Sequence, residues 1–303
     1  MFPNPASHRH RRVGYALALS SAAAFGTLAV SGRFAYNDGV DVAGLMALRF
    51  GFAAAGFWLV AMVRKPTFPP LAVSLRIAAL GALVLAVEVT FFFMGLKAEG
   101  MTAGLAETVF FIYPAWVVFI TAVAHRQKPN RVVILSTALA ISGVAMTAGD
   151  LDADAQTGLV YLVIASVLYA IYVVVSGRLL AGVDNLAAST IMTTGTAATL
   201  VAVALVGGAS YPQSQSGWLA VISAILLGTF AAYALLYLAL DRLPSPIVAI
   251  LTTAEPLVAI CVGAALLGER LTAIQSIGGG LILIAVVGLL VVEERRHQAQ
   301  IHS

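Results

Sequence analysis

The chain contains ten apolar stretches of about 20 residues each, and this pattern limits its fold more than any other feature. A helix of about that length covers the roughly 30 Å of hydrocarbon in a bilayer. With 60% hydrophobic residues, 10% charged residues and a mean hydropathy of +0.96, the chain is too apolar for a soluble domain. We therefore expect an all-α integral membrane protein with ten transmembrane helices. They are expected near residues 13–35, 42–63, 75–96, 101–124, 131–149, 157–180, 186–207, 216–239, 245–267 and 272–292.

The connections between these stretches are short, which leaves only two tails outside the membrane. Residues 1–12 form a basic tail and residues 293–303 a charged one. The sequence HRHRR before the first stretch, and SSAAAFG within it, also fit a cleaved signal peptide. Because the apolar run continues past the small residues to Phe34, a retained helix is the preferred interpretation.

Two segments resemble each other at a spacing of 142 residues. Residues 245–270 align with residues 103–128 so that Pro256 matches Pro114. Proline lacks a backbone N–H and clashes with the preceding turn, so it kinks or breaks a helix. At 1.5 Å per residue both prolines lie near the membrane midplane. Matched hinges there are typical of the binding site of a secondary transporter, although prolines in membrane helices can also serve packing alone.

A second match supports a duplication of the whole chain. The tetrapeptide VSGR stands at residues 30–33 and again at residues 175–178. These matches predict two repeats of five helices each, at residues 13–150 and 156–292. Because five is odd, the second repeat must enter the membrane upside down relative to the first. The sequence therefore predicts an inverted repeat.

Lys and Arg residues are distributed unevenly over the two ends of the expected helices. Thirteen fall on the side of the two termini and three on the other, where Asp150, Asp152 and Asp154 also lie. Since cytoplasmic loops carry an excess of Lys and Arg, we expect a plasma (inner) membrane protein with both termini in the cytoplasm. The thirteen are Arg9, Arg11, Arg12, Arg64, Lys65, Arg76, Arg126, Lys128, Arg131, Arg178, Arg242, Arg295 and Arg296, and the three are Arg33, Lys97 and Arg270.

Four ionisable residues fall within the expected spans: Arg49, Glu88, Glu107 and Glu255. A charge in hydrocarbon is costly, so each is a candidate for function. Arg49 and Glu107 have similar expected depths and are predicted to form an ion pair, either structural or in contact with a ligand. Glu88 and Glu255 have no such cation, and at least one is expected to exchange a proton or to meet a substrate amine. The alternative for Glu255 is a kink residue bonded to neighbouring backbone.

The ninth and tenth stretches carry a resemblance to a known family. Glu255-Pro256 lies inside the ninth helix, LGERL closes it at residues 267–271, and Gly278 lies in the tenth. With the two five-helix repeats, this pattern resembles the drug/metabolite transporter (DMT) superfamily, EamA type, over essentially the whole chain. The resemblance implies a transporter of small metabolites, often an exporter of amino acids, that works by alternating access.

The first repeat departs from this pattern at two places. Tyr113 stands where the second repeat has Glu255, and Gln127 stands where it has Glu269. The two acids are therefore not expected to act symmetrically.

Aromatic and hydroxyl side chains are expected around the buried carboxylates. Tyr233 and Tyr237 share one side of the eighth helix, and Tyr169 and Tyr172 share one side of the sixth. Contact between helices is the alternative role for such side chains; at a cavity they would suit an amphipathic solute. The candidates for the substrate or coupling site are Glu88, Glu255, Tyr113, Thr252, Thr253, Trp116, Tyr169, Tyr172, Tyr233 and Tyr237, with Arg49 and Glu107 as an ion pair and Pro114 and Pro256 as hinges.

Several classes of protein do not fit the sequence. There is no lysine inside a span for a retinal, no cluster of metal ligands and no phosphate-binding loop for ATP, and the single Cys261 cannot form an internal disulfide. We expect no catalytic residues, cofactor or metal. The expected function is secondary transport, with export favoured, of amino acids or drug-like amphipathic solutes, with protons as a candidate coupling ion. A facilitative channel or uniporter is the alternative, followed by a membrane-embedded enzyme.

Overall fold

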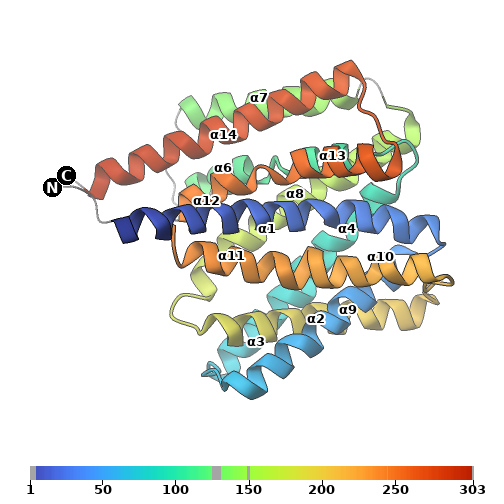
Figure 1. The fold of residues 1–303 in the computed structure, drawn as a ribbon, viewed down its shortest axis with the longest axis horizontal. Helices are drawn as coiled ribbons and strands as arrows, with labels where there is room; N and C mark the ends of the chain where they lie inside the picture. The colour runs from blue at the N-terminus through green and yellow to red at the C-terminus, as the bar shows by residue number, and fades with distance from the viewer. Residues whose placement is uncertain (1–4, 125–130, 149–150, 244, 302–303) are drawn as a thin grey trace.

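The computed structural model describes the chain apart from residues 1–4, 125–130, 149–150, 244 and 302–303, and every regular element in the described ranges is helical. The long helices run along the long axis of the molecule (Figure 1). α1 begins and α14 ends on the same side, at the left of Figure 1. We call the membrane face on this side the tail face, and the other the opposite face.

The first half of the chain crosses between these faces five times. The passes are α1 (Pro5–Asn37), α2 (Val42–Arg64), α3–η1–α4 (Leu71–Leu80, Gly81–Leu85, Ala86–Lys97), α5–α6 (Ala103–Phe110, Tyr113–Ala124) and α7 (Arg131–Ala148). The π-helical segment η1 joins two α-helices without a gap, whereas a two-residue turn separates α5 from α6.

The second half repeats this plan. Its passes are α8 (Ala153–Leu179), α9 (Asn185–Gly207), α10–η2–α11 (Gln215–Ile225, Leu226–Ala231, Ala232–Leu240), α12–α13 (Ser245–Thr252, Glu255–Leu267) and α14 (Ala273–Ile301). α1 runs from the tail face to the opposite face and α8 runs back (Figure 1). The two halves are therefore inverted, as the odd number of passes predicted.

The membrane character of the bundle is confirmed by its helices and its surface. In the described part of the chain, nine helices are long and apolar enough to cross a membrane, and α7 adds a shorter apolar stretch, Ile134–Ala148. Large apolar side chains are exposed on the outside of the bundle, with Val63 and Leu205 each 76% exposed. Such a surface is stable against lipid tails rather than against water.

The helices continue beyond the expected spans at both ends of the chain. α1 already begins at Pro5, inside the expected basic tail, and α14 runs on to Ile301, well past residue 292. The tails are thus largely helical extensions of the first and last passes.

Close approach of backbones holds the fifth and tenth passes together. A Cβ atom added to Gly278 of α14 would lie 2.6 Å from the carbonyl oxygen of Gly143 in α7, and one added to Gly143 would lie 2.5 Å from the carbonyl oxygen of Gly278. Small residues let membrane helices pack at this distance. This contact is the physical reason for a glycine at position 278.

The GGG sequence in α14 allows a matched test of this packing. We expect Gly278→Ala to lower the thermal unfolding midpoint of the purified protein in detergent, because overpacking costs about 1–3 kcal/mol. Gly280→Ala is the control, since no other described part of the protein beyond its own helix backbone lies within 4 Å of its added Cβ. Alanine there should leave the midpoint unchanged or raise it, because alanine favours helix over glycine. Equal effects of the two substitutions would contradict the packing interpretation.

Candidate functional site

Two passes are broken near their middle, at equivalent positions of the two repeats. α5 ends at Phe110 and α6 begins at Tyr113, while α12 ends at Thr252 and α13 begins at Glu255. Both pairs of limits are 142 residues apart, the spacing of the sequence repeat (252 − 110 and 255 − 113). In each break proline is the second residue of the following helix, where its missing N–H removes no helical hydrogen bond. The helix breaks are present at both prolines, and their action as hinges stays a prediction.

Two further passes contain π-helical segments that the sequence did not predict. η1 and η2 begin 145 residues apart (226 − 81), the same spacing as the two VSGR segments. π-Helical turns occur frequently at functional sites. In η2, the Thr229 hydroxyl donates a 3.0 Å hydrogen bond to the carbonyl of Ala224, five residues earlier. The distorted turn thereby presents Thr229 to the interior of the protein.

A cavity of about 410 Å³ lies between the two repeats, lined by residues from both. Its size falls within the range of small-molecule sites, roughly 300–1,000 Å³. The lining extends from Tyr113 and Glu255 at the helix breaks to Leu180, Asn185 and Leu240 near the tail-face ends of their passes. The cavity therefore reaches toward the tail face.

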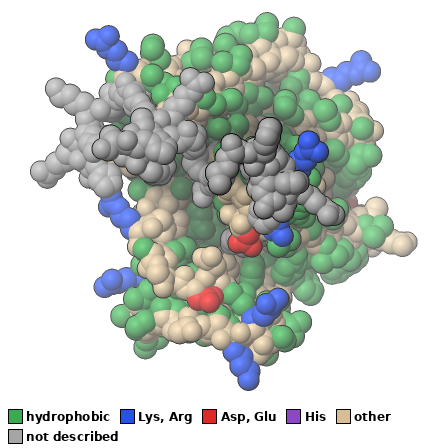
Figure 2. All heavy atoms as spheres, turned by 60° about the vertical axis from the view of Figure 1, so that its left-hand side comes forward, with side chains coloured by type: hydrophobic (Ala, Val, Ile, Leu, Met, Phe, Trp, Pro, Cys, Tyr) green, Lys and Arg blue, Asp and Glu red, His purple; other side chains and the backbone are tan. Residues whose placement is uncertain are grey.

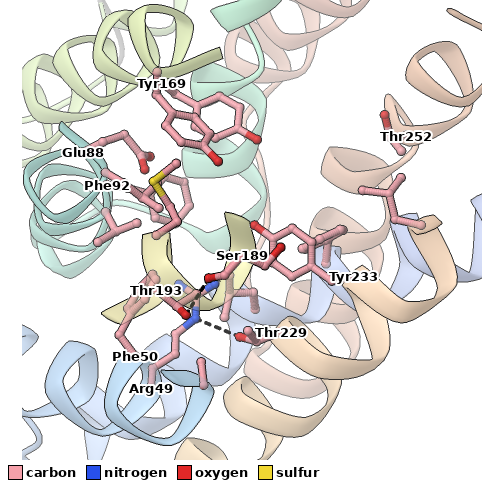
Figure 3. A pocket seen from close by; sticks show the side chains of 18 of the residues that line it. Arg49, Phe50, Glu88, Phe92, Tyr169, Ser189, Thr193, Thr229, Tyr233 and Thr252 are labelled. Atoms are coloured by element: carbon pink, nitrogen blue, oxygen red, sulfur yellow. Dashed lines mark hydrogen bonds between the residues drawn. The ribbon is translucent and has the colours of Figure 1, made fainter. Parts of the chain in front are cut away.

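All four predicted intramembrane charges line this cavity. Arg49, Glu88 and Glu107 are 6%, 3% and 5% exposed, and Glu255 is half-buried. Figure 3 shows Arg49 on one side of the cavity and Glu88 on another. The fold has gathered residues from four different passes into one polar centre inside an apolar protein.

Arg49 is held by a hydroxyl and two aromatic rings. Its Nε donates a 3.0 Å hydrogen bond to Oγ1 of Thr229 (Figure 3). The centre of the guanidinium lies 5.0 Å from the ring centroid of Phe50 and 5.8 Å from that of Phe93. Cation–π contacts of this kind stabilise a charge away from bulk water.

The expected ion pair between Arg49 and Glu107 is not formed among the described side chains. The guanidinium turns to Thr229, because the π-helical turn brings that hydroxyl within hydrogen-bond distance. Glu107 lines the same cavity and is close enough to interact with Arg49 electrostatically. The two residues thus share the cavity without direct contact.

Aromatic rings form one wall of the cavity. The Tyr169 ring lies 4.7 Å from Tyr113, 5.3 Å from Phe110 and 5.6 Å from Tyr172, measured between ring centroids. Phe92 extends the cluster through Phe110 at 5.0 Å. Helices α4, α5, α6 and α8 contribute to this wall, in which apolar rings lie beside the phenol groups of the tyrosines.

The other predicted candidates divide between the cavity and the surrounding packing. Tyr233 and Thr252 line the cavity, on the side away from Glu88 (Figure 3). Thr253 is absent from the lining, and its hydroxyl donates a 2.6 Å hydrogen bond to the carbonyl of Ile250. Tyr237 belongs to α11, but its side chain lies outside the described part of the structure.

Trp116 faces away from the cavity. It packs against the apolar cluster of Ala140 and Leu289, which belong to the α7–α14 pair. Its indole Nε1 is buried and has no hydrogen-bond partner among the described residues. The expectation that Trp116 lies at the cavity does not agree with this geometry, because α6 turns that face toward its neighbouring helices.

Several polar lining residues were not among the predicted candidates. Asn185, Ser189 and Thr193 come from the first turns of α9, and Thr229 comes from η2. The run of Ser and Thr at the start of α9 is visible in the sequence and could have indicated that this helix contributes polar lining residues. Nothing in the sequence marked the π-helical turn that presents Thr229.

On the side of the opposite face, the cavity ends against the largest apolar cluster among the described residues. Leu45, Phe93, Leu96, Met101 and Leu105 belong to it and are almost completely buried. They occupy the ends of α2, α4 and α5 that lie toward the opposite face, and Met101 lies in the connection between α4 and α5. Packed side chains therefore close the protein on this side.

A carboxylate ties three passes together at the same end. Oε1 of Glu269 lies 3.4 Å from Nε of Arg33 at the end of α1. Oε2 of Glu269 accepts a 2.8 Å hydrogen bond from the backbone N–H of Ala103 at the start of α5. Gln127, the equivalent residue of the first repeat, lies outside the described residues.

Two aspartates join the loops of the two repeats at the opposite face. Asp38 accepts hydrogen bonds from the Ser214 hydroxyl and from the backbone N–H groups of Ser214 and Gln213. Asp41 accepts from the backbone N–H of Ser210 at 3.0 Å. The Ser214 hydroxyl bond, more than the backbone bonds, holds the pKa of Asp38 below its ordinary value. This contact therefore stabilises the fold above the unfolded-state pKa of Asp38 and is lost as the pH falls through the lower folded-state pKa.

Known proteins share both the sequence pattern and the fold. Residues 12–149 and 156–291 each match the EamA-like transporter family. The chain is 24% identical to the "Uncharacterized transporter YcbK" of Bacillus subtilis (strain 168) over 296 residues, which cover 93% of this chain and 94% of that protein. It is 25% identical to the "Uncharacterized transporter YxxF" of the same organism over 187 residues, 59% of each protein.

A solved structure described only as "Crystal structure of protein" has the same fold. Its TM-score is 0.64 at 16% identity, over 93% of this chain and 98% of that one. The two family matches together span most of the sequence, and the inverted helical architecture agrees with them. The chain belongs to the EamA-like transporter family, and it is a membrane transporter.

Proposed function

We propose that this transporter is a secondary active transporter of small organic solutes and that it works by alternating access. The observation that carries the proposal is one cavity that holds both helix breaks, a guanidinium and three carboxylates between two inverted repeats. Discontinuous helices at such an interface commonly hold substrates and coupling ions. The structure supports this proposal as one state of the cycle, in which the cavity reaches toward the tail face and is closed toward the opposite face.

The cavity lining indicates the chemistry of the solute. Arg49 would bind a carboxylate, and Glu88, Glu107 or Glu255 would bind an amine or a proton. The aromatic wall around Tyr169 would hold an apolar or aromatic group. These features together favour an amino acid or another small amphipathic molecule with a cationic or zwitterionic head.

The distribution of basic residues supports an orientation of the protein in the membrane, while export as the direction of transport is favoured by the family resemblance. Lys and Arg side chains are spread around the tail face (Figure 2). Because cytoplasmic loops carry such an excess, we assign the tail face to the cytoplasm and the protein to the plasma membrane. The cavity in this state would then receive its solute from the cytoplasm.

A channel is disfavoured by the apolar cluster that closes the cavity toward the opposite face. A carrier and a channel differ in a measurable way, because only a carrier exchanges solute on one side for solute on the other. A uniporter would also exchange solute on one side for solute on the other, but its transport would not be coupled to protons.

The proposal is tested first by ligand screening and counterflow. In a thermal-shift panel of amino acids, amines, nucleosides and sugar phosphates, we expect amphipathic amino acids or amines to stabilise the purified protein. In proteoliposomes loaded with the unlabelled hit, the labelled hit should accumulate transiently above equilibrium. Absence of this overshoot despite measurable flux would indicate a channel. Stabilisation by sugar phosphates alone would refute the proposed class of solute.

Glu255→Gln tests coupling to protons. We expect the variant to lose accumulation of the hit driven by a pH gradient, because glutamine cannot bind and release a proton. Solute-for-solute exchange should persist, since exchange needs no net proton movement. Asp241→Asn removes an exposed carboxylate elsewhere and serves as the control. Unchanged gradient-driven accumulation in Glu255→Gln would exclude Glu255 as the proton carrier.

Glu269→Ala tests how the opposite face is closed. The probe is Ser189→Cys, which places a cysteine in the cavity, in a Cys261→Ser background. We expect this cysteine to react several-fold faster with a membrane-impermeant thiol reagent added at the opposite face when Glu269→Ala is present than when Glu269 is intact. The reason is that Glu269→Ala removes both the contact with Arg33 and the hydrogen bond from the Ala103 N–H. Arg270→Ala, which changes the adjacent exposed residue, should leave the rate unchanged. An equal rate in Glu269→Ala and the parent would show that these contacts do not hold the closed state.

A further inference from the structure

A second cavity, of about 570 Å³, lies near the opposite face and is separate from the central one. Its lining comes from α2, α4, α8 and α9 and from the residues that flank them. α2 packs closely against α9, and α4 against α8. The cavity is therefore bounded by two closely packed helix pairs, each containing one helix from each repeat.

The walls formed by α4 and α8 change from charged to uncharged with depth. On α4, Lys97 lies at the membrane surface, and Met94 and Thr90 follow deeper along the helix. On α8, Asp154 lies at the surface and Tyr161 lies deeper. Seven residues separate the first and last of these on each helix, which corresponds to about 10 Å of depth.

The other two walls continue the uncharged part. Asp41, the N-cap of α2, stands at the rim, and buried Met46 of α2 lies more than one turn deeper. On α9, Leu200 and Val203 complete the lining. Val203 is 54% exposed, so the α9 wall of the cavity is open to the lipid side of the bundle. An occupant with a polar head and an apolar chain would match this arrangement.

The charges at the rim are of both signs. Lys97 is exposed, and its Nζ lies 5.6 Å from the ring centroid of Tyr36. Glu99 and Asp154 are exposed and make no hydrogen bond or ion pair within the described part of the chain. Asp41 is already engaged by the backbone N–H groups of Gly44 and Ser210. The rim thus offers one cation and two carboxylates to an occupant.

We propose that this cavity binds one phospholipid with a phosphoethanolamine headgroup, taken from the leaflet at the opposite face. Lys97 binds the phosphate, Glu99 or Asp154 accepts hydrogen bonds from the primary ammonium, and an acyl chain lies along Met94, Leu200 and Val203. Charge-assisted hydrogen bonds of this kind are stronger than neutral ones. A choline headgroup has no N–H to donate, and a glycerol headgroup brings only negative charge toward the two carboxylates.

This site depends on the position of the cavity in the bilayer and not on the solute or the coupling ion proposed above. It also lies between helices of different repeats, so a bound lipid contacts both halves of the protein at once.

Native mass spectrometry of the full-length protein with dioleoyl lipids tests the proposal. We expect one phosphatidylethanolamine to bind about tenfold more tightly than phosphatidylcholine or phosphatidylglycerol, as one or two charge-assisted hydrogen bonds allow. Lys97→Gln should remove most of this preference. Arg270→Gln, which removes another exposed cation at the same face, should not. Equal binding of the three lipids, or loss of the preference in both variants, would overturn the proposal.

A second pair of variants tests the apolar part of the site. Val203→Trp places a large ring in the cavity and should prevent retention of the lipid. Val206→Trp, on the same helix but outside the lining and 91% exposed, should retain it. Free phosphoethanolamine at the same concentration should not displace the lipid. Displacement by the free headgroup, or equal retention by the two tryptophan variants, would show that the acyl chain does not occupy this cavity.

Discussion

The whole structure depends on one requirement, which is that backbone N–H and C=O groups in hydrocarbon must find partners within the protein. Continuous helices meet it in most passes. The two broken passes meet it with short turns, in which the N–H of Ile112 bonds the carbonyl of Val109 and that of Ala254 bonds the carbonyl of Leu251, each at 3.2 Å. Irregular backbone in these passes is placed beside the central cavity. The helix breaks and the central cavity therefore occur at the same place in the fold.

The sequence was sufficient for the architecture because helix length, hydropathy and proline each have a direct structural meaning. Apolar stretches of membrane length predicted the passes, and the odd number in each repeat predicted their inversion. Pro114 and Pro256 marked both helix breaks, because a proline ring clashes with the preceding turn of a helix and proline has no N–H to bond to it. Burial of a charge is costly enough that Arg49, Glu88, Glu107 and Glu255 were selected without knowledge of the fold.

The parts of the candidate site that the sequence did not predict depend on the rotation of each helix about its axis and on contacts between distant segments. A single sequence does not encode either directly. Trp116 and Tyr113 lie within one turn of each other, yet only Tyr113 lines the cavity. The partner of Arg49 could not be found, because Thr229 is 180 residues away and is presented by a π-helical turn. No residue type marks such a turn as proline marks a break. Depth alone therefore suggested Glu107 as the partner.

One part of the protein takes no share in the central cavity. None of the described residues that line it comes from α7 or α14, which lie side by side at one edge of the bundle (Figure 1) and are joined through Gly143 and Gly278. Substitutions in the cavity-lining helices can therefore change the preferred solute while this pair keeps its packing. The protein thus keeps the helices that line the cavity separate from a closely packed helix pair at its edge. New specificities can then arise within one fold without a compensating change at its edge.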